Sequence, residues 1–404
     1  MSAFQERTSS RRGPRWGMLA VLLASSLVAA SCAGAATSAP TSTPTSAPTS
    51  ASACAQFSSA TPQTVRISIS PYFEYQPWAI ADKLGYDEQL GIDLKFTNLP
   101  GHAEGILAAQ RGDVDLVSTC PGCNFSYVKN VPDFKDMLIT NKFDGFIVVG
   151  RKGENLTQDE LLAQGMSPEE AKTKVLESLV GKKFVVRASG DIEPVIGGIG
   201  QIGKGEKDIT IINYPDDYKA ALAFISGVGD YYMGSLPQES KLLLEFEGKY
   251  VKVAGQDVLG PAALWFSSTG AMVKWLDANP ETVMKLHAVW YRAMRALREM
   301  PDVAYPMFTE LINTRVQSAF TPDQVKLITT DLETYYTYQE AKDRAYNPSS
   351  SEYWRLMADF YAKLNVGGWV PANFVVDDSY YEEKYFNEFM TRQDLLGCVD
   401  SPLE

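Results

Sequence analysis

The order strand–helix–strand–helix–strand occurs twice along this chain, and this repetition constrains the fold more than any single motif. The first copy is predicted to run through residues 65–117 and the second through residues 183–232. Clusters of β-branched residues predict the strands, as at 65–69, and apolar residues at helical spacing predict the helices, as at 77–90. Strands that alternate with helices favour parallel sheets covered by helices, so we expect an α/β protein with two similar lobes.

The rest of the folded chain is predicted to be mostly helical. Residues 157–179 form a helical insert between the two copies, and Ser167 and Glu170 have the spacing of a capping box. From residue 271 onward helical patterns dominate, and residues 281–298 place their apolar side chains on one stripe. We expect this helical tail to pack on the first lobe.

The first residues have the pattern of an export signal. Several Arg residues precede an apolar run from Gly17 to Ala30, which is too short to span a bilayer well and ends in small residues. Cys32 follows as in the lipobox of bacterial lipoproteins, so we predict a signal peptide over 1–31 and a lipid on Cys32. Plain secretion with cleavage nearby is the alternative, and the sequence does not distinguish the general secretory route from the twin-arginine route. Residues 32–60 begin with a segment of Ala, Ser, Thr and Pro, which predicts a flexible linker.

The charge of the chain excludes some partners. Its formal net charge is −12. An acidic protein of this kind is repelled by nucleic acids and by anionic lipid surfaces, so we predict no nucleic-acid partner.

The cysteines are informative once export is accepted, because disulfides form in oxidising compartments. Beyond Cys32 four cysteines remain, and they allow three pairings. The simplest interpretation of Cys120-Pro-Gly-Cys123 is a local disulfide around a tight turn; a redox motif, half of a zinc site and free thiols are the alternatives. A zinc site needs further ligands, and the only histidines are His102 and His287, so we predict no metal.

Five segments resemble a known protein family. They span residues 78–86, 90–94, 107–115, 179–183 and 279–283. They are similar to substrate-binding proteins of ABC importers for nitrate, sulfonates, taurine and thiamine-pyrimidine precursors. The resemblance implies a two-lobe periplasmic-binding-protein fold of type II, with a mainly parallel sheet flanked by helices in each lobe and two strands crossing between the lobes. It also implies a small molecule bound in the cleft between the lobes and delivered to an ABC permease and its ATPase.

Further expectations follow from this resemblance. We assign residues 61–148 and 259–404 to the first lobe and residues 149–258 to the second. Both ends of the folded chain then lie on the first lobe, so we predict that Cys54 pairs with Cys398, beside the local Cys120–Cys123 pair. We also expect a monomer without cofactor or enzymatic activity, tied by its lipid to the outer face of the bacterial cytoplasmic membrane.

Ligands of parallel α/β sheets bind beyond the carboxyl ends of the strands, where loops and helix N-termini converge. This rule selects four loops and two nearby aromatic residues. The candidate ligand-binding residues are Tyr72, Phe73, Glu74, Tyr75, Gln76, Cys120, Gly122, Cys123, Ser189, Asp191, Glu193, Tyr214, Ser235 and Trp265. His102, just before a predicted helix, is a further candidate.

The chemistry of these loops leaves the charge of the ligand open. The tyrosines can stack on a flat ligand, and Glu74, Asp191 and Glu193 can accept hydrogen bonds from amines or ring N–H groups. Arg187, at a predicted strand end, can instead hold an anion. Two functions other than import stay open: a pyrimidine-synthase-like enzyme of the same fold, and a tethered ligand sensor. A structural role for these residues, with Asp191 as a helix N-cap, is the plainest alternative.

Overall fold

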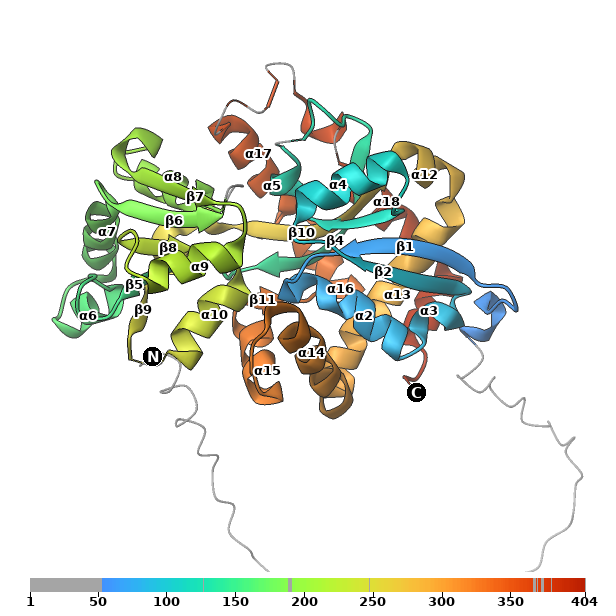
Figure 1. Cartoon of the computed structure of the whole chain (residues 1–404). Helices are drawn as coiled ribbons and strands as arrows, with labels where there is room; N and C mark the ends of the chain where they lie inside the picture. Colours follow the sequence, from blue (N-terminus) through green and yellow to red (C-terminus); the bar gives the residue numbers. More distant parts are fainter. Residues whose placement is uncertain are drawn as a thin grey trace, which may run out of the picture. The chain divides into compact units, whose positions relative to one another are not determined.

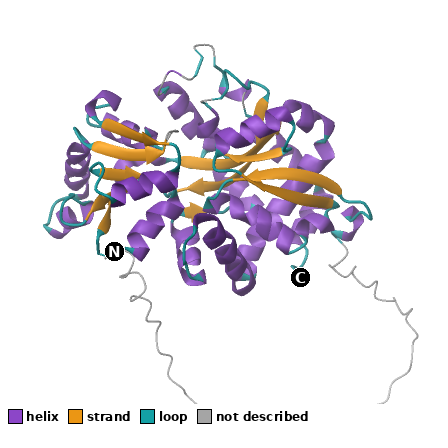
Figure 2. Cartoon of the chain, viewed as in Figure 1, coloured by secondary structure: helices purple, strands orange, loops and turns teal. Residues whose placement is uncertain are grey.

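The computed structural model describes residues 53–125, 127–187, 191–246, 248–365, 368, 370–371, 374–378 and 380–403. The predicted signal peptide, Cys32 and Ser189 lie outside these residues, so those predictions stay untested. Within the described residues the strands form two sheets of mixed direction (Figures 1 and 2). We call them the large sheet, with six strands, and the small sheet, with five.

The large sheet has the strand order β11-β4-β10-β3-β1-β2. Its strands are β1 (Gln63–Ile69), β2 (Ile92–Asn98), β3 (Leu116–Thr119), β4 (Phe134–Phe143), β10 (Trp265–Met272) and β11 (Glu333–Thr334). Strand β1 pairs in parallel with β2 and β3, whereas β10 is antiparallel to β3 and to β4.

The small sheet has the order β7-β6-β8-β5-β9. Its strands are β5 (Val148–Arg151), β6 (Lys183–Arg187), β7 (Thr210–Tyr214), β8 (Tyr231–Met233) and β9 (Tyr250–Ala254). Strand β6 is parallel to β7 and β8, and β5 is antiparallel to β8 and β9.

The expected α/β fold is therefore confirmed, but antiparallel strands interrupt both parallel sets. The sequence analysis placed the parallel strands and missed β4, β5, β9 and β10. These strands lie outside the two strand–helix repeats, and β4 and β10 are buried over nearly their whole length. A strand buried on both faces lacks the alternation that makes a half-buried strand visible in a sequence.

Helices cover both sheets, and α9 packs on β6, β7 and β8 of the small sheet. The helices between β1 and β4 are α2 (Gln76–Lys83), α3 (Tyr86–Gln89), α4 (His102–Arg111) and α5 (Pro121–Asn124). Those between β5 and β10 are α6 (Gln158–Ala163), α7 (Pro168–Leu179), α8 (Glu193–Gly200), α9 (Asp217–Ile225), α10 (Leu236–Glu245) and α11 (Gln256–Leu259). The helix predicted over 77–90 is broken at Gly85, whose φ of 69° is a conformation that favours glycine.

The C-terminal part is helical, as predicted, and packs mainly around the large sheet. It contains α12 (Val273–Ala278), α13 (Pro280–Glu299), α14 (Pro301–Val316), α15 (Pro322–Asp331), α16 (Tyr338–Glu340), α17 (Trp354–Leu364), α18 (Glu382–Phe389) and α19 (Gln393–Asp400). Helix α13 contacts α2, α14, α18, α19 and β4. His287 is fully buried on α13, as expected for a core histidine. Among the described residues, none of the helices combines the length and apolar character that crossing a membrane requires.

Two disulfides join the described residues, and both predicted pairs are present. Cys54, in the turn before β1, is bonded to Cys398 in α19, so the bridge ties the two ends of the described chain together. Cys120 is bonded to Cys123 across the short helix α5.

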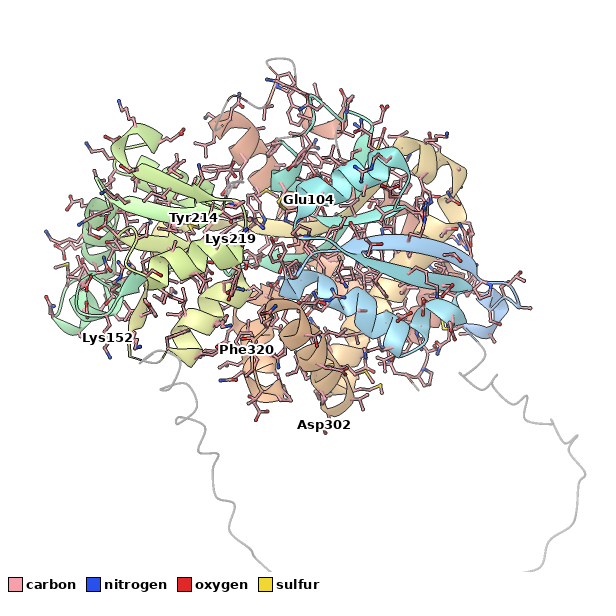
Figure 3. All side chains as sticks on the ribbon, in the orientation of Figure 1. Glu104, Lys152, Tyr214, Lys219, Asp302 and Phe320 are labelled. Carbon is pink, nitrogen blue, oxygen red and sulfur yellow. A yellow bond between two sulfur atoms is a disulfide. The ribbon has the colours of Figure 1, made fainter. Side chains whose placement is uncertain are left out.

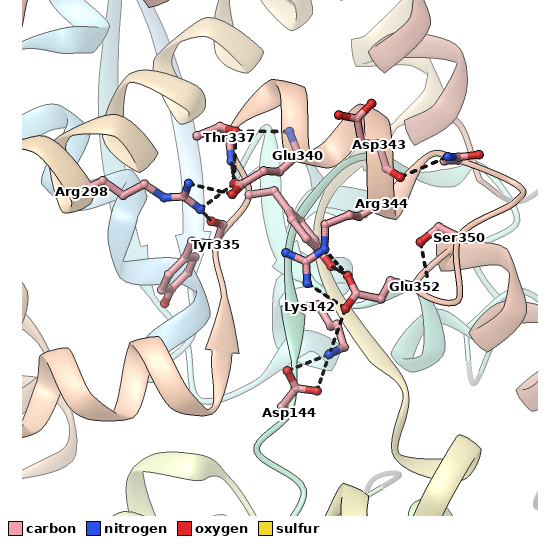
Figure 4. A network of polar contacts seen from close by, with 12 residues as sticks. Lys142, Asp144, Arg298, Tyr335, Thr337, Glu340, Asp343, Arg344, Ser350 and Glu352 are labelled. Carbon is pink, nitrogen blue, oxygen red and sulfur yellow. Dashed lines mark hydrogen bonds and ion pairs between the residues drawn. The ribbon is translucent and has the colours of Figure 1, made fainter. Parts of the chain in front are cut away.

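The chain passes twice between the two sheets. Asp144–Ile147 joins β4 to β5, and residues 255–264 join β9 to β10. The first crossing is held by a network of polar contacts (Figure 4), in which Lys142 Nζ lies 2.9 Å from Asp144 Oδ2 and 3.6 Å from Glu352 Oε1. The Asp144 amide also donates to the Leu332 carbonyl at 2.9 Å. These contacts anchor the crossing to the C-terminal part of the chain.

Candidate functional site

A cavity of about 530 Å³ opens between the two sheets, and residues of both sheets and Phe146 of the first crossing line it. Ten of the residues predicted from the sequence are in its wall: Tyr72, Glu74, Tyr75, Cys120, Gly122, Cys123, Asp191, Glu193, Ser235 and Trp265. A cavity of this size matches those that take up small molecules in other proteins. The loops selected by the strand-end rule therefore meet in one place.

The large sheet contributes a cluster of aromatic rings. The ring of His102, at the start of α4, lies 5.6 Å from that of Tyr72 and 5.9 Å from that of Tyr75. The Tyr75 hydroxyl donates to the Thr119 carbonyl at 2.6 Å, and His102 Nδ1 lies 3.1 Å from the Ser118 carbonyl oxygen. These contacts tie the rings to the end of β3, and burial lowers the pKa of His102, which favours the neutral imidazole.

The Cys120–Cys123 turn forms the next part of the wall. The Cys123 amide donates to Cys120 Sγ at 3.1 Å, which closes the first turn of α5. Gly122 lies directly against the Trp265 ring, and a Cβ at this position would overlap the indole. Glycine is therefore required here for the close approach of the turn to Trp265.

Aromatic residues also line the cavity at the first crossing and at the start of β10. Phe146, in the first crossing, packs edge-on against Phe143 at 5.0 Å and against Trp265 at 5.2 Å. Trp265 packs in turn against Tyr361 of α17 at 4.9 Å. These contacts place large flat side chains at the base of the cavity, where the two sheets are joined.

The small sheet contributes charged groups. Arg187, at the end of β6, donates to Asp191 Oδ1 at 2.8 Å, and its guanidinium carbon lies 5.2 Å from the centre of the Tyr72 ring. Glu193 is the first residue of α8 and is 6% exposed. The cation–π contact between Arg187 and Tyr72 links groups from the two sides of the cavity.

Three carboxyl groups in the cavity wall have raised pKa values. Burial raises the pKa of Glu193 to about 8, with a further contribution from the charge of Asp191. Burial also raises the pKa of Asp191 to about 6, although the nearby Arg187 opposes that shift. For Glu74, burial raises the pKa to about 7. Such shifts are common where a protein holds charged groups for a function.

Glu74 belongs to a buried pair of acids. The second member, Glu333 in β11, has a pKa raised well above its ordinary range by burial and by the charge of Glu74. Asn141 Nδ2 donates a hydrogen bond to Glu333. Burial and mutual repulsion thus disfavour ionisation of both carboxyl groups at once, so the pair can share a proton.

Three predicted residues lie away from the cavity wall. Phe73 is fully buried and packs against the rings of Phe308 and Phe320, both 6.0 Å away (Phe320 is labelled in Figure 3). The side chain of Gln76 is buried and donates to the Tyr72 carbonyl at 2.6 Å, so it supports the loop from behind. Tyr214 ends the edge strand β7 outside the wall.

The reasons for these differences are local. The loop after β1 turns as a short 3-10 helix, Phe73–Tyr75, so neighbouring side chains point in different directions. Some side chains open into the cavity and others into the core, and a strand-end rule cannot separate them.

Several wall residues were not predicted from the sequence. They include Glu104, Tyr127, Phe143, Phe146 and Asp216. Asp216 follows β7 and caps α9, accepting from the Lys219 amide at 2.8 Å, and the capping pattern was a signal that could have found it. Figure 3 shows Glu104 and Lys219 on helices α4 and α9, which flank the region between the two sheets. Phe143 and Phe146 gave no signal, because strand β4 was not predicted and the expected crossing was not assigned to particular residues.

One group of wall residues has the composition of a metal site. The ligand atoms of His102, Cys120 and Cys123 lie within 4.8 Å of one another. The disulfide engages both sulfur atoms, so thiolate coordination first needs its reduction.

The sequence itself has no match among protein-family models or curated proteins. Solved structures do match. The alkanesulfonate-binding protein SsuA from Xanthomonas axonopodis pv. citri, bound to MOPS, is 14% identical with a TM-score of 0.59, over 80% of this chain and 99% of that one. The chain has the fold of periplasmic binding proteins.

Two further structures extend this likeness. The ligand-binding component of an ABC-type import system from Staphylococcus aureus, with zinc bound, is 14% identical with a TM-score of 0.59, over 81% of this chain and 98% of that one. The periplasmic nitrate-binding protein NrtA from Synechocystis is 12% identical with a TM-score of 0.55, over 85% of this chain and 92% of that one. In each case this chain covers nearly the whole of the solved protein, so the shared fold includes both sheets.

Proposed function

We propose that this protein is an extracytoplasmic solute-binding protein that captures a small molecule between its two lobes and delivers it to an ABC importer. The observation that carries the proposal is the 530 Å³ cavity, whose wall comes from both sheets and from the first crossing. A ligand that touches both walls stabilises the closed arrangement, and the two crossings can act as the hinge. The neighbouring structures support this role, because their own names describe sulfonate binding, nitrate binding and ABC import.

The remaining parts of the proposal concern the lobes and the membrane. The lobes follow the two sheets, with residues 61–148 and 259–404 in the first and 149–258 in the second. The protein acts as an exported monomer that binds its ligand without converting it. A lipid on Cys32 and the linker between it and the disulfide-bonded Cys54 hold it at the outer face of the cytoplasmic membrane, near the permease and its ATPase. Replacing Cys32 with Ala should release the protein from membranes without changing ligand affinity.

Mass spectrometry of molecules released on denaturation of the purified protein tests the binding role. We expect a small molecule that rebinds and reduces the radius of gyration in X-ray scattering. A ligand at a hundred times its dissociation constant adds about 2.7 kcal/mol and raises the melting temperature by about 5–10 °C. Chemical conversion of the released molecule would establish an enzyme instead.

A matched pair of variants tests where the ligand binds. Tyr72 lines the cavity, whereas Tyr218 is exposed on α9 and is absent from the cavity wall. Tyr72→Ala should weaken binding at least tenfold, and Tyr218→Ala should leave it unchanged. Equal affinities for both variants, with circular dichroism showing that both are folded, would place the ligand elsewhere.

A further inference from the structure

Three interior carboxyl groups approach the cavity from both of its sides. Glu74 comes from the loop that follows β1 of the large sheet, and Asp191 and Glu193 come from the segment that follows β6 of the small sheet. Asp191 interacts electrostatically with each of the other two. The carboxyl groups therefore form one acidic cluster that surrounds the space between the sheets.

Part of this cluster has no partner in the protein. Asp191 Oδ2 is a buried oxygen atom without a hydrogen-bond partner among the described residues, whereas the Glu74 carboxyl group interacts by a side-chain hydrogen bond with Glu333. Both residues line the cavity, and each is 9% exposed. Buried polar atoms in folded proteins nearly always have partners, and a buried carboxylate without one is costly. The Asp191 oxygen atom is therefore open to a donor that a ligand brings.

The guanidinium group of Arg187 in the cavity wall already interacts with other groups of the protein. Among the described residues that line the cavity, Arg187 is the one Lys or Arg side chain. It donates to Asp191 at 2.8 Å, is attracted by the charge of Asp217, and lies over the Tyr72 ring. Of its donor atoms only Nη2 has a hydrogen-bond partner among the described residues, and Nε is buried without one, against three interior carboxyl groups. The charge of Arg187 is compensated within the protein, and the surplus in the cavity is negative.

The rest of the wall suits an apolar body that carries a positive charge. Tyr72, Tyr127, Phe146 and Trp265 present aromatic surface to the same cavity. Aromatic faces attract ammonium groups, and they also stack on flat rings.

We propose that the cleft selects an organic cation, an aromatic or otherwise apolar body with an ammonium or amidinium group that donates to Glu74, Asp191 and Glu193. This inference rests on the proposed solute-binding function and names the class of its ligand. An anion such as a sulfonate is disfavoured in the cleft, because three carboxyl groups line it and Arg187 is already paired with Asp191. The selectivity is thus opposite to that named for the sulfonate- and nitrate-binding neighbours.

Probes matched in shape and opposite in charge test the sign of selectivity. Benzyltrimethylammonium is compared with benzylsulfonate, and phenethylammonium with phenylpropionate, by isothermal titration calorimetry at pH 8 on the full folded protein. In each pair we expect the cation to bind at least tenfold more tightly. The inference is overturned if the anions bind as tightly as the cations, or if neither cation binds at millimolar concentration.

Three variants test the residues. Glu193→Gln should weaken binding of the cations ten- to a hundredfold, whereas Glu206→Gln, an exposed position outside the cavity wall, should leave it unchanged. Asp191→Asn should weaken the cations too, and because it leaves Arg187 without its partner it should strengthen the sulfonate. Affinities that do not change in Glu193→Gln, or a sulfonate affinity that falls in Asp191→Asn, would contradict the assignment.

The same measurements separate this inference from the proposed function. A sulfonate or carboxylate that binds in the cleft and reduces the radius of gyration refutes the charge assignment and leaves solute binding intact. If no small molecule, including those released from the purified protein, closes the two lobes, the solute-binding role itself fails.

Discussion

Two regions of this molecule hold carboxyl groups in different ways. At the first crossing between the sheets, Asp144 and Glu352 are paired with Lys142 and Arg344 (Figure 4). In the cavity wall, Glu193 forms no ion pair with a Lys or Arg among the described residues, and Asp191 pairs with Arg187 while keeping one oxygen atom without a partner. The carboxyl groups at the first crossing are thus paired with basic side chains, whereas those in the cavity wall are paired only in part.

The pKa values show the same contrast. Burial acts to raise the pKa of Glu352, but the hydrogen bond from Arg344 and the charge of Lys142 outweigh it and hold that pKa below its ordinary value. Burial is not offset in this way for Glu193, whose pKa rises to about 8. A carboxyl group that is paired within the fold stabilises it, whereas one left unpaired reduces stability and remains available to a ligand. The following predictions test this difference, from the largest expected effect to the smallest.

Replacing Lys142 with Met should destabilise the protein most. The side chain of Lys142 is 10% exposed and serves both Asp144 and Glu352, so its removal leaves two shielded carboxylates without that cation. Breaking a buried ion pair costs about 3–5 kcal/mol. Urea unfolding should show a loss of about this size, and an unchanged midpoint would mean that the hinge pairing contributes nothing to stability.

Replacing Glu193 with Gln should instead increase the stability of the protein. The neutral amide avoids the cost of burying a carboxyl group whose ionisation is disfavoured, and we expect a gain of up to about 4 kcal/mol at pH 8 in the ligand-free protein. Urea unfolding of the variant beside wild type measures the gain. A loss of stability would show that Glu193 has a structural partner after all.

The stability of the ligand-free protein should fall as the pH rises from 5 to 8. The pKa of Glu193 is about 8 in the folded protein and 4.5 in its ordinary state, so between these values the folded state binds more protons than the unfolded state. Each such proton costs about 1.4 kcal/mol per pH unit as the pH increases. The charge of Asp191 and the phenol of Tyr361 face Glu193 and contribute to its environment.

The Glu193→Gln variant isolates this contribution from all other titrations. The difference in unfolding free energy between variant and wild type should grow steadily from pH 5 to pH 8. A difference that is constant over this range would mean that Glu193 does not titrate there.

Replacing Glu340 with Gln should have the smallest effect. Its ion pair with Arg298 lies in the same network at 2.6 Å, but the two side chains are 43% and 35% exposed. Exposed ion pairs contribute about 0–1 kcal/mol, and Gln retains the acceptor that caps α16. A loss as large as that of Lys142→Met would show that exposure does not separate the strong pairs from the weak ones.

The sequence alone determined the repeated strand–helix pattern, the class of fold and the loops that line the cavity. These features are local: the spacing of apolar residues predicts an element, and the carboxyl ends of parallel strands meet at one edge of a sheet. The two disulfides were predicted as well. Cys54–Cys398 was expected because the helical tail returns to the first lobe, and Cys120–Cys123 because the two residues flank a tight turn.

Only the tertiary structure decided which charges have partners. Glu74 is close to Glu333, 259 positions later in the chain, because β11 joins the edge of the large sheet. Arg187 contacts Asp191 and Tyr72, so part of a charge that the sequence left open to an anion is already compensated within the protein. The pairing of a charge depends on groups brought together by long-range packing, and its pKa depends on burial. The local sequence determines neither the pairing of a charged group nor its pKa, yet the two together decide which ligands the cavity can bind.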